Sequence, residues 1–151
     1  MTTGWIRGVY PTRAVPEKAL ERGELFVAES DGEVVGAAII NKQQTEEYKE
    51  GNWTSEPYEN EITVLHTLVI SPKEAGKGYG KKFVDFYEQY ALSHNSRYLR
   101  MDTNARNLRA RALYKKLGYT EVGIVDCDFN GIPSVKMVLL EKILNSGEES
   151  L

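Results

Sequence analysis

Three glycines alternate along the segment Ala75–Lys82, which reads AGKGYGKK. Glycine lets a backbone turn through positive φ, and it lets N–H groups approach an anion without an intervening Cβ. A helix that starts at such a loop adds unpaired N–H donors and about half a positive charge, both of which favour phosphate oxygens. Lys77, Lys81 and Lys82 strengthen this field. The pattern therefore predicts a loop that holds a pyrophosphate.

The flanking segments favour an anion loop over a glycine-rich surface turn, which is the alternative for an isolated glycine triplet. The run Ile62–Ile70 is rich in β-branched and aliphatic residues and ends at Ser71-Pro72, so it is typical of a buried strand. After the loop, apolar residues recur at helical spacing and predict an amphipathic helix to about Ser93. Strand, loop and helix is the order that anion loops need.

Spacing excludes two familiar phosphate loops. A dinucleotide fingerprint needs a glycine where Lys81 stands, although Asp102 lies near the place of its ribose-binding acid. A nucleoside-triphosphate loop needs glycine at the position of Ala75, and Ser or Thr at that of Lys82. The loop therefore belongs to another class of phosphate site.

Further elements are predicted on both sides of this unit. Apolar residues mark one face of a second helix, which follows a short strand at Tyr98–Met101 and ends before Gly118: Ala110, Leu113, Tyr114 and Leu117. A short helix within Thr12–Gly23 comes first in the chain. Turn signals predict two hairpins, Glu24–Glu29 with Glu33–Ile40 around Asp31-Gly32, and Thr120–Cys127 with Val135–Leu140 around Asn130-Gly131.

The segments LHTLVISPKEAGKGYGKKF and NARNLRARALYKKLGY resemble the GNAT superfamily of acetyl-CoA-dependent N-acetyltransferases, and the resemblance covers about Leu25 to Leu140. It implies an α+β fold of three-layer α/β/α type, with a mixed, mainly antiparallel central sheet flanked by helices. We expect a single domain over residues 1–151. The family usually opens with a strand and a longer helical region, whereas 23 residues precede Glu24 here, so we expect a shortened N-terminus.

The resemblance also implies roles for individual residues. The backbone at Leu68, Val69 and Ile70 would pair with the pantetheine arm and donate an N–H to the thioester carbonyl. Tyr114 would contact the cofactor and protonate the departing thiolate. The loop that would bind the pyrophosphate consists of Gly76, Lys77, Gly78, Tyr79, Gly80 and Lys81. The side-chain amides of Asn104 and Asn107 would also contact the cofactor. Ala75 stands where the family usually has Arg or Gln, so we expect the loop to bind mainly through backbone N–H groups.

Both candidate catalytic side chains have a competing structural interpretation. Tyr114 shares a helical face with Leu117, and periodicity alone would assign it to the core, whereas its match to the family pattern favours the acid role. His66 lies where some relatives carry a glutamate that deprotonates the amine through water, and an imidazole pKa of about 6.5 suits a base. A lone histidine in a buried strand is more often a hydrogen-bonded structural residue. Strand alternation predicts that His66, Leu68 and Ile70 share one face.

The composition restricts the remaining classes of function. A chain of 151 residues with 41% hydrophobic and 27% charged residues has the makeup of one globular domain. A net charge of −3 provides no basic field for nucleic acid or anionic lipid. The sequence shows no membrane-spanning run and no secretion signal, and Cys127 has no partner for a disulfide. We expect a cytoplasmic protein with no nucleic-acid or membrane partner and, since His94 and Cys127 form no ligand pattern, no metal.

The segment Asn41–Glu61 is a long polar loop that contains six glutamates. Loops of this length are often functional, and its charge would attract a cationic amine, although charge runs are usually only solvated. Trp53, together with Trp5 and Tyr10, either lines an acceptor pocket or caps the core. The sequence leaves both interpretations open.

We therefore predict an enzyme that moves acetyl from acetyl-CoA to a primary amine by direct attack in a ternary complex. The acceptor is a small molecule or a peptide, and polyamines, amino acids, aminoglycosides and peptide N-termini all stay open. The alternative is a non-catalytic acyl-CoA-binding or regulatory module with an incomplete acceptor site. A homodimer through the aromatic-rich helix and the C-terminal hairpin is a further expectation.

Overall fold

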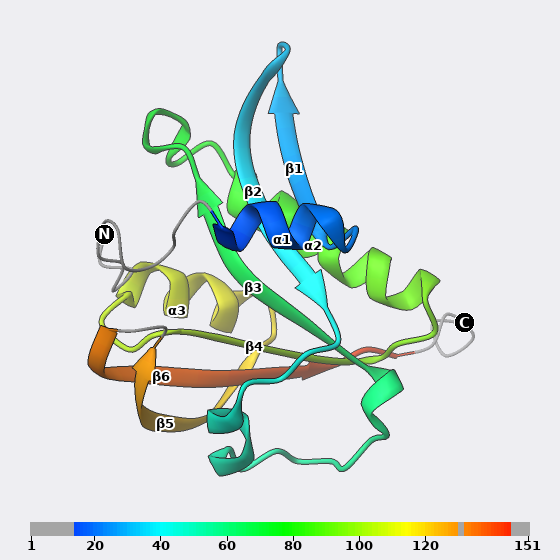
Figure 1. Ribbon diagram of the computed structural model, residues 1–151, viewed down its shortest axis with the longest axis vertical. Helices are drawn as coiled ribbons and strands as arrows, with labels where there is room; N and C mark the ends of the chain where they lie inside the picture. Colours follow the sequence, from blue (N-terminus) through cyan, green and yellow to red (C-terminus); the bar gives the residue numbers. More distant parts are fainter. Residues whose placement is uncertain (1–13, 130–131, 146–151) are drawn as a thin grey trace.

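The structure, a computed structural model, describes residues 14–129 and 132–145 (Figure 1). Its helices are α1 (Ala14–Glu21), α2 (Tyr79–Ser93) and α3 (Leu108–Lys116). Its strands are β1 (Leu25–Ser30), β2 (Glu33–Asn41), β3 (Ile62–Ile70), β4 (Tyr98–Asn104), β5 (Thr120–Phe129) and β6 (Ile132–Ile143). Short 3-10 turns lie between strands and helices, namely η1 (Glu46–Glu50), η2 (Glu59–Glu61) and η3 (Pro72–Glu74).

The strands form one open sheet in the order β1-β2-β3-β4-β6-β5. Neighbours run antiparallel, except β3 and β4, which run parallel and are joined by the crossover helix α2. The predicted mixed, mainly antiparallel sheet flanked by helices is confirmed. So is the hairpin turn at Asp31-Gly32, where φ is 54° and 80°. The predicted strand at Tyr98–Met101 is longer than expected, because its pairing with β6 continues to Asn104.

Helices α2 and α3 cover one face of the sheet. Tyr87 of α2 and Tyr114 of α3 share a buried cluster with Leu65 and Met101 of the two parallel strands. Alternation along a strand sends the neighbouring side chains to the opposite face, so Val64 packs in a second cluster there. The sheet therefore has a core on each side.

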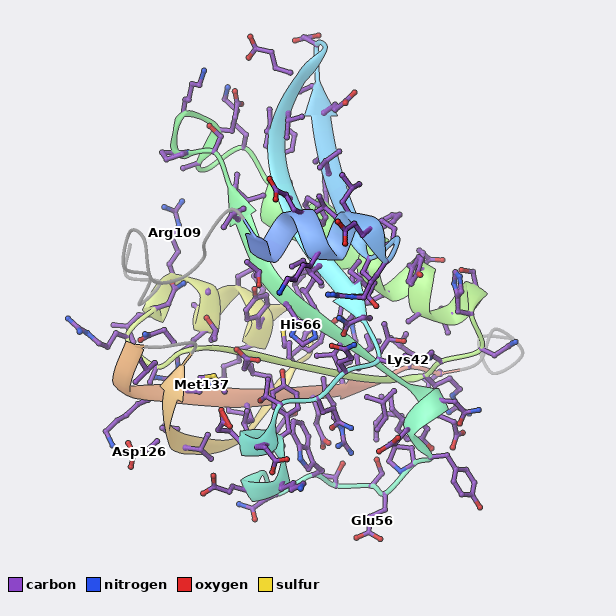
Figure 2. The ribbon with its side chains drawn as sticks, viewed as in Figure 1. Lys42, Glu56, His66, Arg109, Asp126 and Met137 are labelled. Atoms are coloured by element: carbon purple, nitrogen blue, oxygen red, sulfur yellow. The ribbon has the colours of Figure 1, made fainter. Side chains whose placement is uncertain are left out.

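The 41–61 loop covers the second face, and Figure 1 shows it on the opposite side of β4 and β6 from α3. Tyr48 of η1 is buried there with Leu139 of β6. The indole N–H of Trp53 donates to the backbone oxygen of Tyr48 at 2.6 Å, and Arg100 stacks over the indole at 4.1 Å from its centre. Trp53 thus caps this core, whereas Glu56 projects to solvent (Figure 2).

The aromatic residues of α2 pack largely against their own chain. The ring of Phe26 on β1 lies 5.4 Å from that of Phe86 and 5.0 Å from that of Tyr90, measured between ring centres. The expected dimer through this helix stays a prediction. Trp5, Tyr10 and Asn130-Gly131 lie outside the described residues. Within the described ranges, every helix is too short or too polar to cross a membrane.

Candidate active site

Strands β3 and β4 separate partway along their length and form a fork. Their parallel pairing runs from Ile62 opposite Tyr98 to Leu65 opposite Met101, and it stops there. Beyond that rung β3 continues along β2 to Ile70, and β4 continues along β6. Two strand edges therefore diverge with no pairing between them. An extended ligand fits such an opening, because strand edges offer backbone donors and acceptors.

A bulge at Thr67 marks the start of the fork. On β2, Ala37 and Ile39 are two residues apart, whereas their partners on β3, Val69 and His66, are three apart, so β3 holds one extra residue. Thr67 has φ 55°, a left-handed conformation that a β-branched residue rarely adopts and that costs about 1–3 kcal/mol. Such strain persists only where the surrounding structure enforces it.

The bulge corrects one expectation from the sequence. Leu68 and Ile70 pack against the cluster under α2 and α3, on the same side as Leu65. His66 follows Leu65 directly and projects to the other face, so His66, Leu68 and Ile70 do not share a face. Simple alternation fails because the extra residue shifts the pleat by one position.

The glycine loop has the predicted backbone geometry. Gly76 and Gly78 have φ of 83° and 82°, and a Cβ built on either would meet nothing within 4 Å. Helix α2 starts at Tyr79, inside the predicted loop, so Gly80 and Lys81 form its first turn. In the described chain no group accepts from the N–H groups of Gly78, Tyr79 and Gly80. Open space and free donors together suit an anion.

The lysines of this loop are partly engaged elsewhere. Lys77 pairs with Glu74 at 2.8 Å, and Lys81 pairs with Asp85 at 3.2 Å. Both lysine side chains are exposed, so the pairs are weak and screened by salt. Attraction of phosphate therefore rests first on the backbone N–H groups of the loop and of the helix start.

Gly80 brings the loop close to α3. A Cβ at Gly80 would lie 3.2 Å from Cδ2 of Leu113, so the absence of a side chain lets the two helices approach. Asn107 begins α3, where its Oδ1 accepts from the N–H of Ala110 at 3.2 Å. Asn104 likewise caps its own turn, by accepting from the N–H of Arg106 at 2.8 Å. Both amides use their oxygen for the fold, and their NH₂ groups have no acceptor among the described residues.

Tyr114 belongs to the core and also reaches the fork. Its side chain is 6% exposed, and its ring lies 6.1 Å from that of Tyr119 in an edge arrangement. Burial, together with the nearby charge of Asp102, raises the pKa of Tyr114 to about 12. The phenol therefore keeps its proton at neutral pH, and its hydroxyl donates to no acceptor in the described part of the chain.

Asp102 is a site residue that sequence reasoning did not select. It is the residue after Met101, so it comes directly after the last rung that joins β3 to β4. The hydroxyl of Tyr48 donates to its Oδ2 at 2.6 Å. Burial raises the pKa of Asp102 to about 6, the Tyr48 hydrogen bond opposes this shift, and the charge of Glu47 adds to it. The only hint in the sequence is an acid that follows a predicted strand, and its spacing from the glycine loop suggests only the ribose-binding acid of a dinucleotide site.

His66 is held in a hydrogen-bonded network. Its Nε2 lies 2.8 Å from Oδ1 of Asn41, whose Nδ2 donates to Glu24 at 3.1 Å. Burial lowers the pKa of His66 to about 4, against the opposing effects of a hydrogen bond to the backbone of Gln43 and the charge of Glu24. The imidazole is therefore neutral at pH 7, with one nitrogen engaged. Its role as the base stays a prediction.

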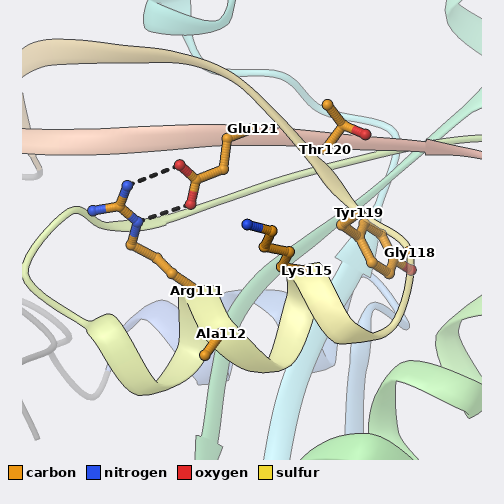
Figure 3. Close-up of a pocket in the computed structure, with 7 residues that line it drawn as sticks. All are labelled: Arg111, Ala112, Lys115, Gly118, Tyr119, Thr120 and Glu121. Atoms are coloured by element: carbon orange, nitrogen blue, oxygen red, sulfur yellow. Dashed lines mark hydrogen bonds and ion pairs between the residues drawn. The ribbon is translucent and has the colours of Figure 1, made fainter.

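A surface pocket of about 600 Å³ lies beside α3 (Figure 3). Arg111, Lys115 and Tyr119 line it, and Arg111 pairs with Glu121 at 2.8 Å. The lining includes neither the glycine loop nor Tyr114. The chemistry-bearing groups therefore meet at the fork rather than in this pocket. Among the described residues, no cluster of three or more His, Cys, Asp or Glu is arranged to hold a metal.

Comparisons with known proteins agree with this fold. The sequence profile of the acetyltransferase (GNAT) family matches residues 3–119. A 5-NmdU N-acetyltransferase of Pseudomonas phage PaMx11 is 30% identical over 107 residues, which are 71% of this chain and 64% of that protein. The chain thus spans less than two thirds of this relative.

Solved structures show the same architecture. A GNAT family acetyltransferase from Streptococcus agalactiae superposes with a TM-score of 0.78 at 22% identity, over 97% of this chain and 80% of that one. One from Elizabethkingia anophelis, with acetyl-CoA bound, gives a TM-score of 0.65 at 20% identity, over 90% and 86% of the two chains. An open mixed sheet with a fork and a glycine loop defines an acyltransferase-type fold. The chain belongs to the acetyltransferase (GNAT) family.

Proposed function

We propose that this protein is an N-acetyltransferase that moves acetyl from acetyl-CoA to a primary amine by direct attack. The observation that carries the proposal is the meeting of three features at one fork: unpaired strand edges, a helix start with free N–H groups, and a buried phenol that keeps its proton. Family membership supports the same reading.

The residues present fit acetyl-CoA. The open space over Gly76 and Gly78 admits a pyrophosphate, and the N–H groups at the start of α2 are oriented to bind it. The fork-facing edge at Leu68–Ile70 can pair with the amide-containing arm as a further strand would. The free NH₂ of Asn107, and that of Asn104 beside it, can donate to the carbonyls of that arm.

The chemistry then follows from positions around the fork. The amine nitrogen attacks the thioester carbon, the C–N bond forms and the C–S bond breaks. A backbone N–H from Leu68–Ile70 at the carbonyl oxygen contributes about 3 kcal/mol to lowering the barrier. Tyr114 gives its proton to the departing thiolate, and general acid catalysis of this kind supplies about 10²–10⁴-fold. Its high pKa leaves the phenol protonated at the start of each cycle.

The acceptor is proposed only as a class. We infer a small-molecule or peptide amine, in a cytoplasmic setting without a nucleic-acid or membrane partner. The name of the phage relative states an acceptor for that protein, 5-NmdU, and this modified nucleoside belongs in the same test panel as polyamines, amino acids, aminoglycosides and peptides.

Calorimetric titration with acetyl-CoA tests the cofactor, and release of free CoA with the amine panel tests the activity. We expect saturable binding with Kd below millimolar, and release with at least one amine. Absence of saturable binding would overturn the proposal. Binding without release for any amine would favour the non-catalytic module instead, and release that depends on Tyr114 would reject that module.

Gly78→Ala and Gly32→Ala form a matched pair for this titration. Both glycines have φ near 80° and open space around a built Cβ, so both variants carry a similar backbone cost. Only Gly78 borders the proposed pyrophosphate. We expect Gly78→Ala to weaken acetyl-CoA binding at least tenfold and Gly32→Ala to leave it unchanged.

A further inference from the structure

Asp102 occupies a distinctive place in the fork. The side chain of Met101 packs with Tyr114 in the core under the helices. Alternation along β4 sends Asp102 to the opposite face, where Tyr48 reaches it from the 41–61 loop. Asp102 and Tyr114 thus stand on opposite sides of the sheet at the same opening, close enough for the charge of Asp102 to act on the phenol.

The groups that face Asp102 include no paired cation. Glu47 and Tyr48 approach from η1, and Tyr114 of α3 lies across the sheet, within reach of the charge of Asp102. On β6 the residue opposite is Leu139. From β3, the nearest titratable side chain beyond the last rung is His66, which hydrogen bonds to Asn41.

Arg100, two residues back along the same strand, does not neutralise Asp102. Its guanidinium donates to Oε1 of Gln44 at 2.8 Å and to the backbone oxygen of Ser55 at 3.2 Å, while stacking on Trp53. No Lys, Arg or His of the described ranges forms an ion pair with Asp102. Asp102 is partly buried, and carboxylates withdrawn from water are normally paired with a cation or hydrogen bonded, so a positive partner would stabilise its charged form beyond the single bond from Tyr48.

We propose that Asp102 receives the proton of the acceptor amine, and that the 41–61 loop, which holds Asp102 through Tyr48, forms a wall of the acceptor site. The inference rests on the proposed function. The acceptor enters as an ammonium ion paired with Asp102, from the loop side of the sheet, and gives one proton to the carboxylate, which frees the nitrogen lone pair. The neutral amine then attacks, the C–N bond forms and the C–S bond breaks, and the thiolate takes the proton of Tyr114 on the helix side. The second N–H proton leaves the nitrogen and, through solvent, restores the phenol of Tyr114. The acceptor class is therefore a cationic primary amine.

The alternative base, His66, is less suited to this step. A carboxyl with a pKa of about 6 is mostly ionised at pH 7, at a ratio of about ten to one, and it accepts a proton more readily than an imidazole with a pKa of about 4. One nitrogen of His66 is also committed to Asn41. His66 and Asp102 lie on the same face, so their variants can be compared directly.

The test measures kcat/KM against pH for wild type, Asp102→Asn, Tyr48→Phe and His66→Gln. The probe is whichever of spermidine, lysine, kanamycin and an alanyl peptide releases CoA fastest. We expect Asp102→Asn to lose 10²–10⁴-fold and its rate to rise with pH without the wild-type plateau, because only pre-deprotonated amine reacts. The Tyr48 hydrogen bond lowers the pKa of Asp102, so its loss in Tyr48→Phe should raise that pKa and shift the acidic limb of the profile to higher pH. If the carboxylate had only a structural role, these variants would not change the pH dependence of kcat/KM.

Asp126→Asn is the matched control. Asp126 is exposed on β5, and Figure 2 shows it at the surface far from His66. The acetyl-CoA affinity of Asp102→Asn should stay within about twofold of that of the wild-type protein. If the wild-type protein does not bind acetyl-CoA, the proposed function is refuted. If Asp102→Asn binds acetyl-CoA and turns over with the pH profile of the wild-type protein, only the role of Asp102 is refuted.

If no amine of the panel turns over, carbon-13 NMR titration of the aspartate carboxyls tests whether Asp102 has a raised pKa and pairs with an ammonium ion. Assigned by its absence in Asp102→Asn, the Asp102 signal should titrate near pH 6 and move toward lower pH when spermidine, as the ammonium probe, is added. A signal that titrates near pH 4, or that ignores the probe, overturns the inference.

Discussion

Replacing Asp102 with asparagine should stabilise the folded protein at neutral pH. Asparagine has nearly the same shape and keeps an oxygen that can accept from the Tyr48 hydroxyl, so the change removes little besides the charge. Groups placed for chemistry often reduce stability, and a partly buried carboxylate without a cation is such a group. The free energy of unfolding is therefore a measure of the site that needs no substrate.

The magnitude follows from the pKa. Burial raises the pKa of Asp102 from an ordinary 3.8 to about 6. The folded protein thus binds the proton more tightly than the unfolded chain, and stability falls as pH rises through this range. Two pH units at about 1.4 kcal/mol each give a difference of roughly 3 kcal/mol. We expect Asp102→Asn to gain about 2–3 kcal/mol above pH 6.5 and almost nothing near pH 3.5.

His66 has the opposite effect in the same pH range. Burial lowers its pKa from 6.5 to about 4, so the folded protein binds that proton less tightly than the unfolded chain. Stability from the neutral imidazole is present above pH 6.5 and is lost as pH falls toward 4. The two contributions largely cancel in wild type. The difference between variant and wild type is therefore the informative quantity, rather than either curve alone.

Urea unfolding from pH 3.5 to 8 at constant ionic strength, followed by circular dichroism, measures this difference. Asp126→Asn, at an exposed position that pairs with Lys136, should differ from wild type by less than about 0.5 kcal/mol at every pH. A difference for Asp102→Asn that does not change with pH, or a loss of stability at pH 7, would refute the argument that the surroundings of Asp102 disfavour its charged form.

Three further outcomes follow from the same structure. Tyr114→Phe should lower kcat about 10²–10⁴-fold in a CoA-release assay while leaving acetyl-CoA affinity within a few-fold; an unchanged kcat would remove the phenol from the mechanism. Gly78→Ala should weaken acetyl-CoA binding at least tenfold by calorimetry, and equal losses in Gly32→Ala would show a general backbone effect. Gly36→Ala should cost about 1–3 kcal/mol in urea unfolding, because its Cβ would lie 3.0 Å from the carbonyl oxygen of Val69; a smaller loss would mean that the strands move apart easily.

Local patterns in the sequence predicted most of the fold. The turn at Asp31-Gly32, the strand before Ser71 and the helix ending at Ser93 all lie where apolar periodicity and turn residues place them. The positive φ of Gly76 and Gly78 also follows from residue type, since glycine adopts it without steric cost. Each of these features depends on residues within about a dozen positions, which is the range over which such patterns act.

The features that sequence reasoning missed depend on distant residues. Tyr48 and Asp102 are 54 positions apart, and nothing in a polar loop shows that one of its tyrosines will be buried against a strand end. The sequence around Thr67 contains no glycine that would indicate a bulge. A β-branched residue there adopts a positive φ, which threonine rarely does. Tertiary packing decided both. The same packing turned Trp53 from a candidate pocket residue into a cap of the core.

The short pairing between β3 and β4 also links ligand binding to stability. Only the rungs from Ile62 to Leu65 join the two halves of the sheet by strand pairing, so the halves depend on the cluster shared by Leu65 and Met101 to stay together. A ligand arm that pairs along Leu68–Ile70 extends this seam. At a hundred times its Kd, such a ligand adds about 2.7 kcal/mol to the free energy of unfolding. If the ligand is the proposed acetyl-CoA, its concentration would raise the folded fraction of the protein as well as occupy the site.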